Sequence, residues 1–110
     1  MKIPLKDAKT YDMKDFIARF LVEKKDGRGF NALIVDVLTR HYKTKLMGAS
    51  RQYLVMEGAG MFIINDEEMS AEPGDFFIIE SGSTYSYSGK MRLFEFNVPA
   101  TDKSNEERLD

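Results

Sequence analysis

The chain has 110 residues, the length of one domain. Sixteen basic and eighteen acidic residues give a net charge of −2, which argues against nucleic acid or an anionic membrane as the main partner because both attract a basic excess. There is no cysteine and one histidine, so disulfides, zinc–thiolate centres, cysteine nucleophiles and any site that needs two histidines of one chain are excluded.

The apolar content of the chain and its first residues bear on where the protein is located in the cell. No apolar run approaches the roughly 20 residues that span a bilayer, and MKIPLKDAKTYD (1–12) lacks the apolar stretch of a signal peptide, so we expect a soluble, cytoplasmic protein. Residues 1–12 predict a strand or an arm at the edge of the fold. MKDFIARFLVEKK (13–25) fits two structures, because its apolar residues recur at helical spacing while Phe20 and Val22 would also share one face of a strand.

The rest of the chain reads as short strands between turns. A turn is predicted at DGRG (26–29) and a buried strand at FNALIVDVL (30–38). Polar and apolar residues alternate only weakly in YKTKLM (42–47). Further strands are predicted at 51–56, 61–64, 76–79, 84–88 and 91–98. Seven or eight strands with frequent turns indicate an all-β barrel or sandwich of antiparallel strands. We expect one domain over 1–99 and a polar C-terminal tail of little order over 100–110.

The glycines of residues 53–99 carry a family resemblance. In YLVMEGAGMFIINDEEMSAEPGDFFIIESGSTYSYSGKMRLFEFNVP, the positions Gly74, Glu80, Gly82, Tyr85 and Gly89 follow the spacing of a Gly–Pro–Gly–His–Asn signature. Both glycines of that signature match, whereas its proline, histidine and asparagine do not. This stretch resembles the cupins, which implies a small jelly-roll barrel but little about function, since cupins host many chemistries.

The resemblance also implies a changed centre of the barrel. It places Tyr85 at one metal-binding histidine position, Arg51 at the glutamate position, and Lys45 and Met47 at the two remaining histidine positions. A lysine and an arginine offer no lone pair at pH 7. We therefore expect no bound metal and no cofactor.

Without a metal, the same residues suggest a ligand pocket. Fixed cations at Lys45 and Arg51 would favour an anion, because arginine grips a carboxylate or phosphate with two hydrogen bonds. Tyr53, Tyr85 and Tyr87 would add phenolic donors and flat walls, which suits a sugar, a sugar phosphate or an organic acid. The alternative is that these tyrosines fill the barrel and leave no cavity.

Two acidic residues interrupt apolar strands. If Asp36 and Glu95 point inward they need partners, for which Lys45 and Arg51 are the candidates, and a carboxylate there could act as a general base. If they point outward they are surface charges, the interpretation that we favour for each alone. The candidate ligand-binding residues are Asp36, Lys45, Met47, Arg51, Tyr53, Tyr85, Tyr87 and Glu95.

Three functions remain open at this stage. The first is a metal-free cupin that binds a small polar or anionic molecule, such as a carbohydrate derivative. The second is a metal-independent sugar isomerase or epimerase, and the third is a dimerisation module with a filled barrel. We expect a homodimer, with FIARFLV (16–22) either at its interface or covering the end of its own barrel. His41, in a short basic run, is expected to be a surface or capped residue.

Overall fold

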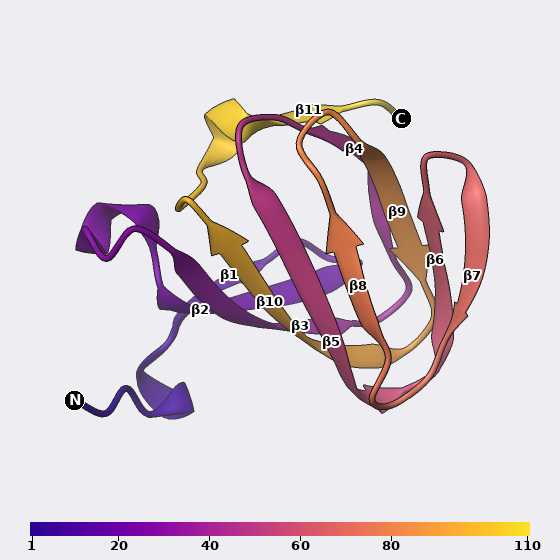
Figure 1. Cartoon of the computed structure of the whole chain (residues 1–110). Helices are drawn as coiled ribbons and strands as arrows, with labels where there is room; N and C mark the ends of the chain where they lie inside the picture. The colour runs from indigo at the N-terminus through magenta and orange to yellow at the C-terminus, as the bar shows by residue number, and fades with distance from the viewer.

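The computed structural model describes residues 1–110 and consists of two antiparallel sheets that face each other (Figure 1). The strands are β1 (Lys9–Asp12), β2 (Phe16–Val22), β3 (Asn31–Val37), β4 (Arg40–Leu46), β5 (Ser50–Gly58), β6 (Gly60–Ile64), β7 (Glu67–Ala71), β8 (Phe76–Ile79), β9 (Thr84–Ser88), β10 (Met91–Val98) and β11 (Glu106–Arg108). The six-stranded sheet has the order β1-β2-β3-β10-β5-β8, and the five-stranded sheet has the order β11-β4-β9-β6-β7. The all-β prediction is confirmed.

Three single-turn 3-10 helices complete the chain: η1 (Leu5–Asp7), η2 (Lys24–Asp26) and η3 (Lys103–Asn105). None of these helices is long and apolar enough to cross a membrane.

Alternation along the strands builds the core. In β10, Met91, Leu93, Glu95 and Asn97 point inward while the residues between them face outward. The same period of two turns Leu33, Val35 and Val37 of β3 into the barrel. The largest fully buried side chains are Tyr53, Tyr85, Tyr87 and Phe62. The core is therefore aromatic at its centre and aliphatic along β3.

Close backbone contact explains two of the glycines in the segment that resembles cupins. Gly58 has a φ of +84°, and a Cβ there would lie 2.1 Å from the Lys90 carbonyl oxygen. Gly89 has a φ of +107°, and a Cβ there would lie 2.6 Å from Gly60 Cα. Only glycine permits both the positive φ and this approach, so the β5–β6 and β9–β10 turns pack directly against each other.

Residues 16–22 form a strand, which resolves the ambiguity of the sequence. β2 pairs with β1 on one side and β3 on the other, and Phe16, Ala18 and Phe20 face the barrel interior. A strand with two neighbours gains backbone hydrogen bonds that a lone helix at this edge would not share with the sheet. Of the two roles expected for FIARFLV, it takes the one of covering the chain's own barrel, and the role at a homodimer interface stays a prediction.

The C-terminal segment differs from the prediction of a tail with little order. Thr101 is buried, and Asp102 caps η3 by accepting a hydrogen bond from the Ser104 amide. Then β11 pairs with β4, with Glu106 opposite Leu46. Figure 1 shows this yellow segment lying along one opening of the barrel. Residues 100–110 therefore belong to the fold, because a charged sequence can still pair through its backbone.

Candidate functional site

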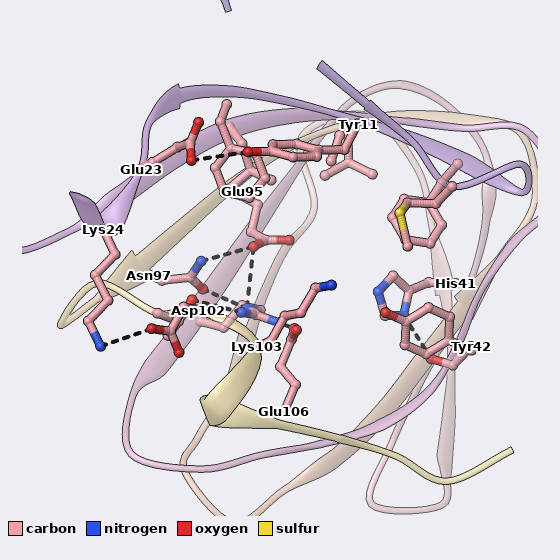
Figure 2. Close-up of a pocket in the computed structure, with 18 of the residues that line it drawn as sticks. Tyr11, Glu23, Lys24, His41, Tyr42, Glu95, Asn97, Asp102, Lys103 and Glu106 are labelled. Atoms are coloured by element: carbon pink, nitrogen blue, oxygen red, sulfur yellow. Dashed lines mark hydrogen bonds and ion pairs between the residues drawn. The ribbon is translucent and has the colours of Figure 1, made fainter. Parts of the chain in front are cut away.

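A large cavity lies on the side of the barrel formed by β1–β4, β10, the Arg51 end of β5 and the C-terminal segment, which we call the open half (Figure 2). Its volume is about 620 Å³, within the roughly 300–1,000 Å³ typical of small-molecule sites. Its apolar wall consists of Tyr11, Met13, Phe16, Ala18, Phe20, Leu33, Val35, Tyr42 and Tyr87. Its polar wall consists of Glu23, Lys24, Lys25, His41, Arg51, Glu95, Asn97, Thr101, Asp102, Lys103 and Glu106.

The side built by β5–β8, which we call the filled half, contains no comparable space. Phe62 and Phe77 stack with ring centroids 4.1 Å apart, and Tyr53 lies 5.4 Å from Phe62. These rings occupy the interior between the two sheets. The expectation of a barrel filled by aromatic residues therefore holds for one half of the molecule only.

A row of polar side chains crosses the six-stranded sheet at the cavity. Asn97 of β10 stands opposite Arg51 of β5 and Asn31 of β3. Glu95 lies two residues earlier in β10 and so points to the same inward face. The register of three neighbouring strands thus places an arginine, a carboxylate and two amides side by side in the barrel.

Arg51 is the centre of this row and is 4% exposed. Its guanidinium donates hydrogen bonds to Asn97 Oδ1 (2.6 Å), Tyr85 Oη (2.7 Å), Thr101 Oγ1 (3.1 Å) and Glu106 Oε1, and its Nε lies 3.3 Å from Glu95 Oε2. Burial by itself lowers the pKa of Arg51, but the groups around it, Glu95 first and then Tyr85, Tyr53 and Glu106, together more than reverse this, so the pKa lies above its usual value. Arg51 is a paired cation that joins the barrel to the C-terminal segment.

Glu95 uses only part of its hydrogen-bonding capacity within the protein. Its Oε2 accepts a hydrogen bond from Asn97 Nδ2 at 2.9 Å and faces Arg51. Its Oε1 has no hydrogen bond or ion pair in the protein. Because Glu95 lines the cavity, this oxygen is an acceptor available to a ligand.

His41 occupies another wall of the cavity, on β4 (Figure 2). Its Nδ1 lies 2.7 Å from the Tyr42 carbonyl oxygen, which only accepts, so Nδ1 carries the proton and Nε2 has the free lone pair. The ring stacks against Phe16, Tyr85 and Tyr87 with centroids 4.7–5.4 Å apart. Burial lowers the pKa of His41 to about 4, so Nε2 is unprotonated at neutral pH.

Three phenols lie between these groups and the filled half. Burial raises the pKa of Tyr53, Tyr85 and Tyr87, so all three remain protonated donors at neutral pH. Tyr85 accepts from Arg51, and Tyr53 lies 3.4 Å from the Tyr85 oxygen. The Tyr87 hydroxyl is buried at the cavity wall with no partner in the protein. An unsatisfied buried hydroxyl at this place is a donor for a bound molecule.

The mouth of the cavity is closed in part by charged pairs from distant parts of the chain. Lys24 Nζ lies 3.3 Å from Asp102 Oδ2, and Tyr11 donates to Glu23 Oε2 at 3.2 Å. Four basic and four acidic side chains line the cavity, namely Lys24, Lys25, Arg51, Lys103, Glu23, Glu95, Asp102 and Glu106. The cavity as a whole is therefore electrically balanced.

The structure brings some of the predicted site residues to the cavity and separates others. Arg51, Tyr87 and Glu95 line the cavity. Behind them, Tyr85 accepts a hydrogen bond from Arg51, and the Tyr53 hydroxyl lies 3.4 Å from the Tyr85 hydroxyl. For Glu95, the outward orientation that we favoured is wrong, because β10 alternates without interruption through Met91–Val98. The expected pairing of Glu95 with Arg51 is present. Whether these residues bind a ligand stays a prediction.

Three of the predicted residues lie outside the cavity. Asp36 faces outward, where it pairs with Arg19 at 2.8 Å and Arg92 at 3.2 Å. Lys45 is half-buried between the inward-facing positions of β4, and Met47 is 48% exposed. The prediction that Lys45 provides a cation inside the barrel is therefore wrong. The alternative in which Asp36 points into the barrel is wrong as well.

A β-bulge explains the missed His41, whereas Lys45 was misplaced by the family resemblance. In β4, His41 pairs with Tyr87 and Thr44 with Tyr85, so two residues of β4 stand opposite one residue of β9. Strict alternation would put His41 on the outward face with Lys45; the extra residue turns His41 and Thr44 both inward. The expectation that His41 is a surface residue is therefore wrong. The one signal in the sequence was the weak alternation of residues 42–47.

The residues present do not fit the divalent metal that many cupins hold. At the positions assigned to metal ligands, Arg51 donates to Tyr85, and Lys45 and Met47 lie outside the cavity. A guanidinium has no lone pair for a metal. No three His, Cys, Asp or Glu side chains come together as a possible metal site.

Comparison with solved structures identifies the fold. Pac13, a unique nucleoside dehydratase, superposes with a TM-score of 0.88 at 19% identity, over 99% of this chain and 90% of that chain. Ectoine synthase from P. lautus gives 0.80 at 18% identity, over 100% and 90%. KdgF from Halomonas sp. gives 0.77 at 13% identity, over 94% and 97%. These are cupin-fold proteins, and the chain shares that fold.

Three further structures of Pac13 from Streptomyces contain uridine, each with one substitution of a tyrosine by phenylalanine or a histidine by glutamine. The first of them superposes with a TM-score of 0.88 at 18% identity, over 99% of this chain and 89% of that chain. No protein-family profile matches the chain. No curated protein sequence matches it either.

Proposed function

We propose that the cavity of the open half binds a small, uncharged molecule rich in hydroxyl groups, of the sugar or nucleoside type. The observation that carries this proposal is the pairing of charge: Arg51 is neutralised by Glu95 and Glu106 within the barrel. An anion would have to compete with these carboxylates. With Lys45 outside the cavity as well, a neutral polar ligand is favoured over the anionic one.

The free hydrogen-bonding groups define what such a ligand must offer. Glu95 Oε1 and His41 Nε2 are acceptors, so the ligand must present donors such as hydroxyl groups to them. The Tyr87 hydroxyl is a donor for a ligand oxygen. The rings of Tyr11, Phe20 and Tyr42 supply flat apolar walls for a sugar or base ring.

The Pac13 structures support this choice of ligand class. Pac13 is a nucleoside dehydratase, and structures of its variants contain uridine. The fold of this chain is similar, and its own cavity is lined by His41 and by the buried Tyr87. Nucleosides are therefore the first compounds to test, with neutral sugars second. The prediction of a cytoplasmic protein is kept with this proposal.

A second candidate is a metal-independent enzyme that moves a proton on a ligand of this class that also carries an aldehyde or ketone group, and His41 favours it. Its unprotonated Nε2 can take a proton from a carbon next to a carbonyl, while phenol donors stabilise the resulting enolate. The proton then returns to carbon, which isomerises or epimerises the ligand, or a β-hydroxyl takes a proton and leaves as water. The low pKa of His41 keeps it available but makes it a weak base.

The third function, a module with a filled barrel, is not favoured because the open half contains a cavity of about 620 Å³. Binding is tested by thermal shift with uridine, other nucleosides, neutral sugars and their phosphates. A ligand at 100 times its dissociation constant stabilises the fold by about 2.7 kcal/mol. We expect a shift with neutral compounds and no larger shift with the phosphates.

Two variants of one sheet make a matched pair for this test. Glu95→Gln changes the carboxylate inside the cavity, whereas Asp36→Asn changes the one outside it. We expect Glu95→Gln to weaken binding about tenfold or more, as expected for loss of a hydrogen bond to a charged group. Asp36→Asn should bind as the unaltered chain does. No shift with any neutral compound, or an equal loss in both variants, would rule out the proposed ligand site.

Proton transfer is tested separately, in D₂O. If His41 acts as a base, deuterium should enter a carbon-bound position of a bound ligand, observed by NMR or mass spectrometry. His41→Gln should abolish the exchange while ligand binding, measured by thermal shift, is reduced less. If the unaltered chain binds a ligand but no deuterium enters it, the protein is a binding protein and the proposal of an enzyme is excluded.

A further inference from the structure

One charged side chain of the cavity wall has no partner in the protein. Of the four basic side chains in the wall, three form ion pairs with the four carboxylates there. These pairs are Lys24–Asp102 (3.3 Å), Lys25–Glu23 (3.9 Å), Arg51–Glu95 and Arg51–Glu106. Because Arg51 takes two carboxylates, none is left for the fourth base, Lys103. Its ammonium has neither an ion pair nor a hydrogen bond within the chain.

The backbone that carries Lys103 is anchored on both sides. Before it, the amide and the hydroxyl of buried Thr101 donate to Asn31 Oδ1 at 2.7 Å and 2.8 Å. After it, Glu106 accepts a hydrogen bond from Arg51. Between these anchors Lys103 is exposed and begins η3. Its side chain is therefore free, while its Cα is held at a fixed place above the cavity.

The side chain of Lys103 points into the cavity. In Figure 2, Asp102 turns to Lys24 at the mouth, whereas Lys103 extends from the C-terminal segment towards the wall that carries His41. An ammonium group has three donors and no lone pair, so only an acceptor can be its partner. In the protein alone this donor has no acceptor, which leaves it available to a bound molecule.

Lys103 also sets the direction of the electric field in the cavity. Arg51 with Glu95 and Glu106, which we call the Arg51 cluster, contains one cation and two carboxylates and so carries one negative charge in excess. Lys103 supplies the balancing positive charge from another part of the wall. A neutral ligand with donors at one end and an acceptor at the other fits this field. An anion would neutralise Lys103 but would be repelled by the Arg51 cluster.

We propose that Lys103 determines the specificity of the cavity by donating a hydrogen bond to a carbonyl oxygen of the bound molecule. This inference rests on the proposed function and narrows its ligand class to neutral, hydroxyl-rich molecules that carry a carbonyl group. The ligand hydroxyls donate to Glu95 Oε1 and His41 Nε2, so Lys103 receives the ligand group that accepts but cannot donate. A carbonyl oxygen does this without a negative charge.

Two neutral rings, scyllo-inosose and scyllo-inositol, test this contact because they differ only in a ketone that replaces one hydroxyl-bearing carbon. Isothermal titration calorimetry of the full chain measures both affinities. We expect the unaltered chain to bind the ketone about tenfold more tightly, as for a hydrogen bond from a charged donor. Lys103→Met should remove this preference and leave the affinity for scyllo-inositol unchanged. Lys103→Arg keeps a cationic donor and should keep most of the preference.

Lys90→Met is the matched control. Lys90 is also exposed and without an ion pair, but it lies in the turn between β9 and β10, outside the cavity. Equal affinities for the two rings in the unaltered chain would overturn the inference. A preference that survives Lys103→Met, or that Lys90→Met removes as well, would do the same. In each of these cases the cavity still binds hydroxyl-rich rings, so the proposed function stands.

Uridine and its 5′-phosphate separate the remaining outcomes. If uridine alone binds, Lys103→Met should weaken it about tenfold through a carbonyl of the base, and an unchanged affinity would overturn the inference. Tighter binding of the phosphate than of uridine, lost in Lys103→Met, would show that the lysine holds an anion and would overturn it too. If neither ring nor uridine binds, the proposed function fails and the inference fails with it.

Discussion

The filled half and the open half of the barrel have the same strand geometry, but the first is packed with side chains and the second contains a cavity. In the filled half, Phe62, Phe77 and Tyr53 meet ring to ring and leave no cavity. In the open half, Arg51 and Glu95 replace such rings at inward positions of β5 and β10, and they pair with each other. Paired polar groups hold a cavity open because they satisfy one another without filling the space, whereas apolar side chains gain free energy by closing it.

The largest expected effect breaks the polar row of the open half. Arg51→Met leaves the buried Glu95 without its cation and detaches Glu106 and Thr101, which should lower the free energy of unfolding by about 3–5 kcal/mol. Urea denaturation measures this loss. Lys45→Met is the matched control, since Lys45 is the other predicted cation but lies outside the cavity; a change within about 0.5 kcal/mol is expected. Equal losses of unfolding free energy in the two variants would mean that the contacts of Arg51 stabilise the fold no more than those of a surface residue.

A pH titration tests the electrostatics of the open half. The unfolded chain protonates His41 near its usual pKa of about 6.5, whereas the folded chain keeps it neutral down to about 4. Stability is therefore complete above about pH 6.5 and falls as pH drops towards 4, by about 3 kcal/mol from this residue.

The difference between the unaltered chain and His41→Gln isolates that contribution, because other titrating groups are common to both. The chain has one histidine, so its imidazole NMR signals also report the folded pKa without ambiguity. A folded pKa near 6.5 would show that the ring is in water and not stacked against Phe16 and Tyr87.

A pair of core truncations compares the two halves directly. Phe62→Ala in the filled half should lower the free energy of unfolding by about 4 kcal/mol, because it opens a void among packed rings. Phe16→Ala, at the wall of the existing cavity, should lower it by about 2 kcal/mol, because the ring already borders open space. Chemical denaturation of both variants gives the difference. Equal losses would indicate that the cavity is closed in solution.

The smallest effect concerns the mouth of the cavity. Lys24 and Asp102 are both about half exposed, and solvent screens their attraction. Asp102→Ala also removes the cap of η3, whereas Lys24→Ala removes only the ion pair. We expect Lys24→Ala to change the free energy of unfolding by less than about 0.5 kcal/mol. A loss above about 1 kcal/mol would mean that the pair fastens η2 to the C-terminal segment, which thermal and urea denaturation would both detect.

The sequence predicted the barrel well and its site only in part. Strict alternation in β5 sufficed to place Arg51 and Tyr53 on one shared face. In β10 it did not say which face was inward, so the favoured outward orientation of Glu95 was wrong. It failed at β4, where one extra residue turns His41 away from the outward face of Lys45 and into the barrel. It also missed Thr101 and Glu106, because a polar C-terminal segment has the composition of a solvated tail.

By itself, the sequence determined the all-β cupin fold, since glycine positions such as Gly58 and Gly89 and the period-two strands are local requirements of backbone and burial. It also determined that a cupin metal site built on several histidines is not available. Only the tertiary structure decided that His41, Glu95 and the C-terminal segment meet at one cavity. That meeting depends on strand register, on a bulge of a single residue, and on backbone pairing between β4 and β11. Of these, only the bulge left a trace in the sequence, as the weak alternation of residues 42–47, and that trace does not say which side chains turn inward.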